Sequence, residues 1–193
     1  MTRQQLALGT AQFGLDYGIT NTAGRVPPAQ VAALLRTAWQ GGVRMIDTAH
    51  AYGDSEQVLG ECMQDEWRLV TKTLPLRCER IGDHELRAVD AAFQDSLRRL
   101  GVARVDTLLV HHAQDLLAPG GEELHTWLLE RKSEGTALRV GASVYDGDEV
   151  AALLDRFDID VVQLPANIAD QRLLADGSIP QLHGSDVEVH VRS

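Results

Sequence analysis

Four side chains that could cooperate in proton transfer each follow a short apolar run. Asp47 and Tyr52 follow Val43–Ile46, Lys72 follows Arg68–Val70, and His111 follows Val105–Val110. A carboxylate beside an ammonium keeps it charged and oriented, and the ammonium would favour a phenolate and lower a tyrosine pKa from its usual value near 10. A histidine could then hydrogen-bond a substrate oxygen. Tyrosine as general acid, worth about 10²–10⁴-fold, suits reduction of a carbonyl group by hydride transfer.

Other polar side chains also lie in or after apolar runs, or in a neighbouring loop. Ser143 follows a fifth apolar run, Gln163 lies within a sixth and Arg192 follows a seventh. Ser143 and Gln163 could equally be hydrogen-bonded core groups, and Arg192 could be a flexible surface charge. His111 and His112 are adjacent, so on a strand they would face opposite sides and only His111 would reach the site. Asp16 and Tyr17, in a long first loop, could line its mouth.

Apolar runs of strand length alternate with helical patterns along the whole chain. The expected strands are Leu6–Gly9, Val43–Ile46, Arg68–Val70, Val105–Val110, Leu138–Val140, Val161–Leu164 and Val187–Val191. One helix opens at Pro27-Pro28 and stops at Gly41-Gly42. A clearer one follows Asp83, the expected N-cap, and ends at Gly101. Two more carry the apolar stripes that begin at Leu124 and Val150.

Alternating strands and helices predict parallel strands joined by crossovers. An open doubly wound sheet usually carries Gly-x-Gly-x-x-Gly after its first strand, and this sequence has none. The remaining architecture is a (β/α)8 barrel of the TIM type, which usually needs about 250 residues. With 193 residues and seven strand candidates, we expect an incomplete barrel, built as a single domain over residues 1–193.

The motifs around these side chains resemble those of the aldo-keto reductases. The match rests on Asp-x-Ala-x-x-Tyr-Gly from Asp47 to Gly53, on Lys72, and on Asp-x-Leu-Leu-x-His from Asp106 to His111. It extends from Leu6 to Ser193. The resemblance implies a catalytic tetrad of Asp47, Tyr52, Lys72 and His111, an NADPH cofactor with NADH not excluded, and a small aldehyde, ketone or sugar as substrate.

The same resemblance implies a set of cofactor-binding residues. Gly9 and Thr10 match the family's opening turn near the nicotinamide, and Gly141-Ala142-Ser143 matches a Gly-Val-Ser whose serine meets the carboxamide. Gln163 matches a glutamine with the same role. The set is Gly9, Thr10, Ser143, Gln163, Arg192 and Ser193. Val144 stands where the family often has asparagine, so one carboxamide contact is not expected.

The family places its pyrophosphate loop, eighth strand and adenosine pocket after the position of Ser193. We therefore expect the 193-residue chain to lack the part that binds the adenine half, and to bind NADPH poorly on its own. A seven-stranded piece also has two open edges, at the first and the last strand. Self-association through these edges is expected.

The amino-acid composition limits the classes of molecule that the protein is expected to bind. With 28 acidic and 18 basic residues the net charge is −10, which disfavours binding to nucleic acid and to anionic membranes. No stretch approaches the roughly 20 apolar residues of a membrane span. Cys62 and Cys78 form neither a disulfide framework nor a metal motif, and a cytoplasmic setting is expected.

Two other functions remain open at this point. One is a truncated, non-catalytic family member that keeps the tetrad but cannot hold the cofactor. The other is a metal-dependent barrel hydrolase that uses Asp47, His111, His112 and a modified Lys72. Against the hydrolase, the sequence has no His-x-His or His-x-x-x-His spacing, and adjacent histidines ligate one ion poorly. No metal is therefore expected.

Overall fold

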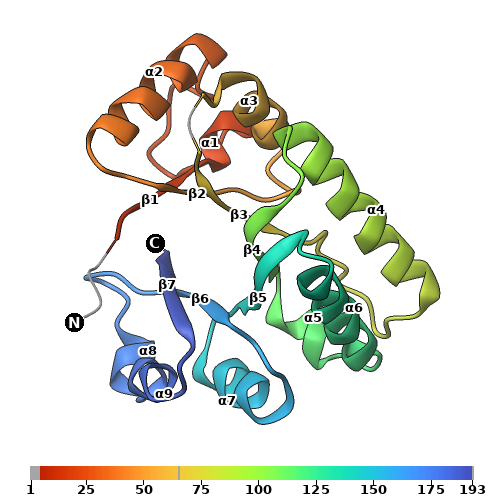
Figure 1. The fold of residues 1–193 in the computed structure, drawn as a ribbon. Helices are drawn as coiled ribbons and strands as arrows, with labels where there is room; N and C mark the ends of the chain where they lie inside the picture. Colours follow the sequence, from red (N-terminus) through yellow and green to blue (C-terminus); the bar gives the residue numbers. More distant parts are fainter. Residues whose placement is uncertain (1–4, 65, 193) are drawn as a thin grey trace.

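Seven parallel strands form one curled sheet in the computed structural model, which describes residues 5–64 and 66–192. The strands follow one another in chain order, and each is parallel to its neighbours (Figure 1). They are β1 (Ala7–Gly9), β2 (Met45–Asp47), β3 (Arg68–Lys72), β4 (Val105–Val110), β5 (Ala137–Ser143), β6 (Val161–Pro165) and β7 (Glu188–Arg192). Among the described residues β1 and β7 are the edges, which confirms the incomplete barrel. Ser193 lies outside the described residues.

Helices cover the outer side of the sheet (Figure 1). They are α1 (Ala11–Gly14), α2 (Pro28–Gln40), α3 (Ser55–Cys62), α4 (Asp83–Leu100), α5 (Ala113–Leu117), α6 (Gly121–Ser133), α7 (Gly147–Arg156), α8 (Arg172–Ala175) and α9 (Ser178–His183). The four predicted helices are α2, α4, α6 and α7. The predicted cap of α4 is wrong: Asp83 is the first helical residue, and Gly82 precedes it as N-cap. Glu85 explains this start, because its carboxylate accepts a hydrogen bond from the Gly82 N–H at 3.0 Å.

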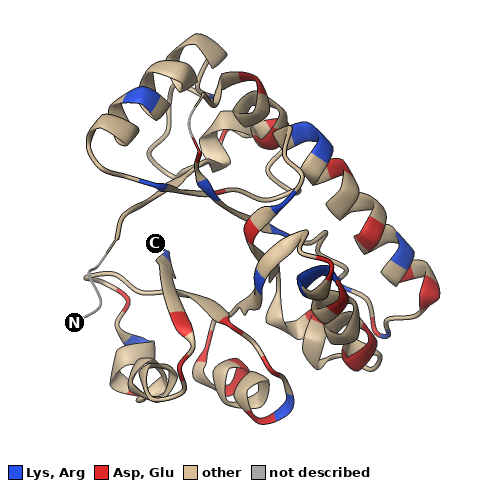
Figure 2. Cartoon of the chain, viewed as in Figure 1, with Lys and Arg blue, Asp and Glu red and all other residues tan. Residues whose placement is uncertain are grey.

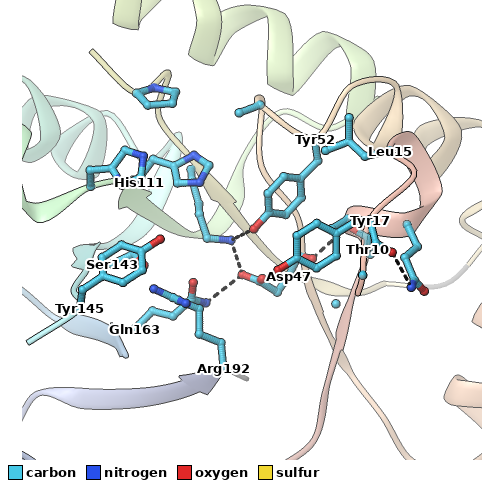
Figure 3. Close-up of a pocket in the computed structure, with 18 of the residues that line it drawn as sticks. Thr10, Leu15, Tyr17, Asp47, Tyr52, His111, Ser143, Tyr145, Gln163 and Arg192 are labelled. Atoms are coloured by element: carbon cyan, nitrogen blue, oxygen red, sulfur yellow. Dashed lines mark hydrogen bonds and ion pairs between the residues drawn. The ribbon is translucent and has the colours of Figure 1, made fainter. Parts of the chain in front are cut away.

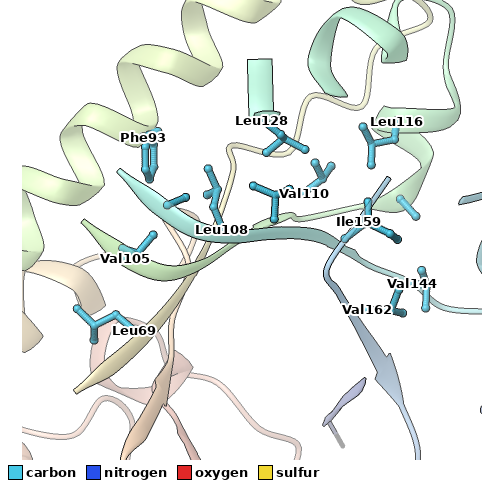
Figure 4. Close-up of a cluster of buried hydrophobic side chains, with 14 of the residues drawn as sticks. Leu69, Phe93, Val105, Leu108, Val110, Leu116, Leu128, Val144, Ile159 and Val162 are labelled. Carbon is cyan, nitrogen blue, oxygen red and sulfur yellow. The ribbon is translucent and has the colours of Figure 1, made fainter. Parts of the chain in front are cut away.

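The core lies between the sheet and these helices (Figure 4). Leu108 and Val110 of β4 pack with Phe93 of α4 and Leu128 of α6, and all four side chains are buried. Burying one such side chain contributes roughly 1.5–3 kcal/mol. This packing fixes β4 and β5 against the outer layer and so fixes the direction in which their ends point.

Inside the curled sheet, side chains two residues apart along a strand form layers. The middle layer is apolar and buried, and consists of Met45, Val70, Leu109 and Val161. Two residues further along three of these strands stand Asp47, Lys72 and Gln163. The polar side chains therefore gather at the carboxyl ends of the strands, on top of an apolar layer.

A charged layer lies at the other end of the strands. Arg68 of β3 pairs with Asp106 of β4 at 3.1 Å and with Glu188 of β7 at 3.7 Å, and Arg139 of β5 contacts both carboxylates. The two arginines hold the pKa of Asp106 below its usual range against the opposing effect of burial. Away from this layer, acidic and basic residues are interspersed along the outer helices (Figure 2). None of the helices in the described part of the chain is both long and apolar enough to cross a bilayer.

Two strands end at least two residues later than their apolar sequences suggested. β3 continues through Thr71 to Lys72, and β5 continues through Gly141 to Ser143. The predicted ends at Val70 and Val140 are therefore wrong. Lys72 and Ser143, the last residues of these strands, line the site pocket. Thr71 points the other way and donates a hydrogen bond to Glu56 of α3 at 2.6 Å.

Candidate active site

Lys72 lies at the centre of a hydrogen-bonded group at the carboxyl ends of β2 and β3. Its ammonium Nζ lies 2.8 Å from Asp47 Oδ1, donates to the Thr48 carbonyl at 2.9 Å, and lies 3.5 Å from the Tyr52 hydroxyl (Figure 3). The lysine side chain is only 2% exposed, whereas Asp47 is 20% exposed. The three side chains lie together, as the sequence predicted. Their chemical roles remain predictions.

A tight turn after β2 presents Tyr52 to this lysine. Gly53 has φ +57°, in the left-handed region that favours glycine. A Cβ atom on Gly14 would lie 1.8 Å from the Tyr52 carbonyl oxygen, so α1 approaches the turn as closely as backbone allows. The two glycines thus let backbone pack on backbone and fix the position of the phenol.

The pKa of Tyr52 moves in the opposite direction from the one expected. Burial raises it well above its usual value, and the Asp47 carboxylate raises it further. Burial also lowers the pKa of Lys72, and Asp47 works against that change. The phenol is therefore not made more acidic in this state, because the cost of removing a phenolate from water outweighs the opposing effect of the Arg192 charge. Tyr52 is protonated at neutral pH, as a proton donor must be.

His111 lies beside the phenol. Its ring meets the Tyr52 ring edge-on, with 5.9 Å between centroids. Burial, reinforced by the charge of Lys72, lowers the pKa of His111 to about 4, so the imidazole is neutral at pH 7. Its Nδ1 atom is buried and has no hydrogen-bond partner within residues 5–64 and 66–192.

His112 also reaches the pocket, which the sequence did not predict. β4 ends at Val110, and His112 is the N-cap residue of α5, so the alternation of a strand no longer applies. The rings of His111 and His112 stack with 5.0 Å between centroids. The prediction that only His111 faces the site is therefore wrong.

The low pKa of His111 predicts a loss of stability in acid. In the unfolded chain a histidine binds its proton near pH 6.5, whereas folded His111 binds it only near pH 4. As pH falls through this window the unfolded state takes up the proton first, so the free energy of unfolding decreases. Urea unfolding of the wild type and of His111→Gln at pH 7, 5.5 and 4 measures it. We expect a smaller decrease in the variant; equal decreases would contradict the assignment.

A pocket of about 530 Å³ opens above these side chains. Its lining includes the tetrad and five of the six predicted cofactor-binding residues, namely Gly9, Thr10, Ser143, Gln163 and Arg192. Ser193, the sixth, lies outside the described residues. Tyr17 lines the pocket as expected, whereas Asp16 is not part of the lining. The loop turns Asp16 away, so that its carboxylate lies next to Gly24.

Gln163 and Ser143 both line the pocket, and Gln163 has an oxygen available for a further hydrogen bond. The Gln163 amide Nε2 donates to Asp47 Oδ1 at 3.0 Å. Its Oε1 is buried, with no partner in the described part of the chain. A buried polar atom without a partner is uncommon in proteins. An amide donor such as the carboxamide of a nicotinamide would satisfy Oε1, so these residues fit the expected cofactor.

Arg192 is held by contacts rather than free at the surface. Its guanidinium lies over the Tyr145 ring, 4.4 Å from the centroid, and donates to the Val144 carbonyl at 3.4 Å. The alternative of a flexible surface charge is therefore wrong. Register explains this position: Arg192 pairs with Pro165, the last residue of β6.

Sequence reasoning missed several residues of the lining, among them Gln12, Arg77 and Tyr145. Arg77 and Tyr145 lie in loops that follow β3 and β5, and position after a strand was the signal that could have identified them. No cluster of three or more His, Cys, Asp or Glu residues suited to a metal ion occurs in residues 5–64 and 66–192.

Comparison with known proteins identifies the family. The model of the aldo/keto reductase family matches residues 5–188. The chain belongs to the aldo/keto reductase family. The predicted resemblance is thereby confirmed, and the curled parallel sheet is the family's barrel with seven strands described.

Relatives of this family member are oxidoreductases. Pyridoxal 4-dehydrogenase of Microbacterium luteolum is 26% identical over 83% of this chain, and 6-dehydroglucose reductase of Novosphingobium aromaticivorans is 30% identical over 75%. The chain spans 57% and 52% of their lengths, little more than half. An aldo/keto reductase of Klebsiella pneumoniae, solved with NADP and acetate, superposes with a TM-score of 0.71 at 25% identity, over 95% of this chain and 61% of its own.

Proposed function

We propose that this aldo/keto reductase catalyses the NADPH-dependent reduction of an aldehyde, ketone or sugar carbonyl, with Tyr52 as proton donor. One observation carries the proposal. A single buried ammonium, Lys72 Nζ, lies 2.8 Å from Asp47 and 3.5 Å from the Tyr52 hydroxyl. Such a group can stabilise the phenolate left after the proton has moved, and Asp47 holds it in place.

A nicotinamide cofactor, when bound, supplies the hydride. Ser143 and Gln163 would hold its carboxamide, since both line the pocket and Gln163 Oε1 has no partner in the described residues. The substrate oxygen would lie between the Tyr52 hydroxyl and His111. Because His111 is neutral at pH 7, it can donate an N–H to that oxygen without itself transferring a proton. Asp47 and Lys72 orient the phenol throughout.

Oxidation of NADPH by the chain with an aromatic aldehyde tests this function. The wild type should consume NADPH and form one equivalent of alcohol, faster with NADPH than with NADH. A chain that binds the aldehyde but forms no alcohol at millimolar concentrations of either cofactor would contradict the proposal. As part of this proposal we place the protein in the cytoplasm. Cys62 and Cys78 are free thiols, as is usual for proteins of a reducing compartment.

We also propose that the 193 residues alone bind NADPH weakly. β1 and β7 are the unpaired edges of the described sheet, and Val191 at the second edge is 59% exposed. The pocket residues assigned above would contact the nicotinamide end of the cofactor. Titration followed by NADPH fluorescence should show a dissociation constant well above micromolar, and a micromolar value would refute this. The same edges favour self-association, which sedimentation at increasing protein concentration would detect.

A further inference from the structure

Arg77 has a strained backbone that a buried carboxylate maintains. It is one of two described non-glycine residues with positive φ, at +49°, in the left-handed region that most side chains avoid. Asp115, only 4% exposed, accepts hydrogen bonds from the Leu76 N–H at 3.0 Å and from the Arg77 N–H at 3.1 Å. Both oxygens of the Asp115 carboxylate are thus used to fix the loop after β3. Strain held in this way points to a function of the side chain it places.

The Arg77 side chain lines the active-site pocket. Its guanidinium contacts His112 Nε2 at 3.3 Å. A guanidinium has no acceptor, so Nε2 must accept the hydrogen bond and His112 must carry its proton on Nδ1. Among the described residues no carboxylate lies within 4 Å of this guanidinium. Its remaining N–H groups are available to a ligand.

The pocket has an excess of positive charge in a protein that is acidic overall. Among the described residues its lining includes Lys72, Arg77 and Arg192, but only one carboxylate, that of Asp47. Asp47 is already bonded to Lys72 and to Gln163. Guanidinium groups bind carboxylates and phosphates through paired, charge-assisted hydrogen bonds. A ligand that carries an anionic group would balance this charge.

We propose that Arg77 is a specificity-determining residue that selects carbonyl substrates bearing a carboxylate or phosphate group. The proposal rests on the function proposed above and names its substrate class. His112 stacks between His111 and Tyr145, at 5.0 Å and 6.2 Å between centroids. With the carbonyl at Tyr52 and His111, the anionic group lies beyond His112. The substrate therefore has a spacer between its two ends, and the stacked rings form an apolar wall along it.

Two matched pairs of small carbonyl compounds test the selection. 4-Carboxybenzaldehyde and its methyl ester differ in the charge of one carboxyl group and by one methyl group, and glyceraldehyde 3-phosphate and glyceraldehyde provide the phosphate pair. Ligand-observed NMR with the 193-residue chain measures their dissociation constants. We expect the wild type to bind the charged member of one pair about fivefold more tightly, as for a single exposed ion pair. Equal affinity within both pairs, including no detectable binding, would overturn the proposal.

Three variants separate selection from folding. Arg77→Gln should bind the two members of each pair equally. Arg77→Gly should do the same and be at least as stable to heat as the wild type, because glycine tolerates positive φ. Arg80→Gln, an exposed arginine of the same loop outside the lining, should keep the preference. A preference that survives in Arg77→Gln would overturn the proposal.

The neutral methyl ester keeps this test distinct from that of the function. If the wild type reduces the ester with NADPH but shows no preference for either charged compound, the role of Arg77 is wrong and the reductase activity stands. If the preference is present and depends on Arg77 but no aldehyde is reduced at millimolar NADPH, the proposed reductase function is wrong, while the anion site stands.

Discussion

Replacing Tyr52 with phenylalanine is expected to lower kcat for aldehyde reduction by about 10²–10⁴-fold, the usual contribution of a general acid. The change removes one hydroxyl and keeps the ring, which packs against His111. The hydroxyl acts only when negative charge develops on the substrate oxygen, so the affinity for NADPH should change little. Steady-state kinetics together with fluorescence titration measure both quantities.

Tyr17→Phe is the matched control for this experiment. Tyr17 lines the same pocket, but its side chain is exposed and it lies in the loop before α2. The identical loss of a hydroxyl there should change kcat far less. If both variants lost the same activity, or if Tyr52→Phe kept wild-type turnover, the proton would come from another donor. Because burial raises the pKa of Tyr52, the wild-type rate should show no loss from Tyr52 ionisation around neutral pH.

Replacing Lys72 with methionine is expected to have the second largest effect. It leaves the Asp47 carboxylate without its ammonium partner and removes the ammonium that lies 3.5 Å from the Tyr52 hydroxyl. Breaking a buried ion pair from one side costs about 3–5 kcal/mol. We expect a value near the lower end, because Asp47 is 20% exposed. Activity should fall by at least about 10²-fold.

The double variant Asp47→Asn with Lys72→Met separates the two effects. Removing the charge of Asp47 as well removes the unpaired carboxylate, so much of the lost stability should return. The activity should not return, since the ammonium is still absent. Urea unfolding and NADPH oxidation measure the two quantities. Recovery of activity in the double variant would show that Lys72 acts only by neutralising Asp47.

The sequence predicted the order of the strands and four of the nine described helices, α2, α4, α6 and α7, because these elements follow apolar periodicity. The stripe from Leu86 to Leu100 belongs to α4, and each apolar run corresponds to one strand. Strand ends were harder to predict, since Thr71 and Lys72 are polar and still belong to β3. At the carboxyl end of a barrel strand the inward side chain faces the site, so the apolar pattern stops before the strand does.

The tetrad could be predicted because four residue types at fixed positions after strands carry it. The direction of the Tyr52 pKa shift could not be predicted, because its largest cause is burial, and burial is a tertiary property. The position of His112 depended on where β4 ends. Arg77 depends on Asp115, 38 residues later in the chain, and no local pattern connects the two.

Isotope transfer from NADPH tests the central claim, that this site reduces a carbonyl group with Tyr52 as the acid. The chain is incubated with millimolar NADPH deuterated at C4, at the transferred position, and with methyl 4-formylbenzoate, and the alcohol is analysed by mass spectrometry. We expect one deuterium on the carbon that was the carbonyl carbon, and a rate of formation at least about 10²-fold lower with Tyr52→Phe. A folded wild-type chain that forms no deuterated alcohol, or equal rates for wild type and Tyr52→Phe, would contradict the account.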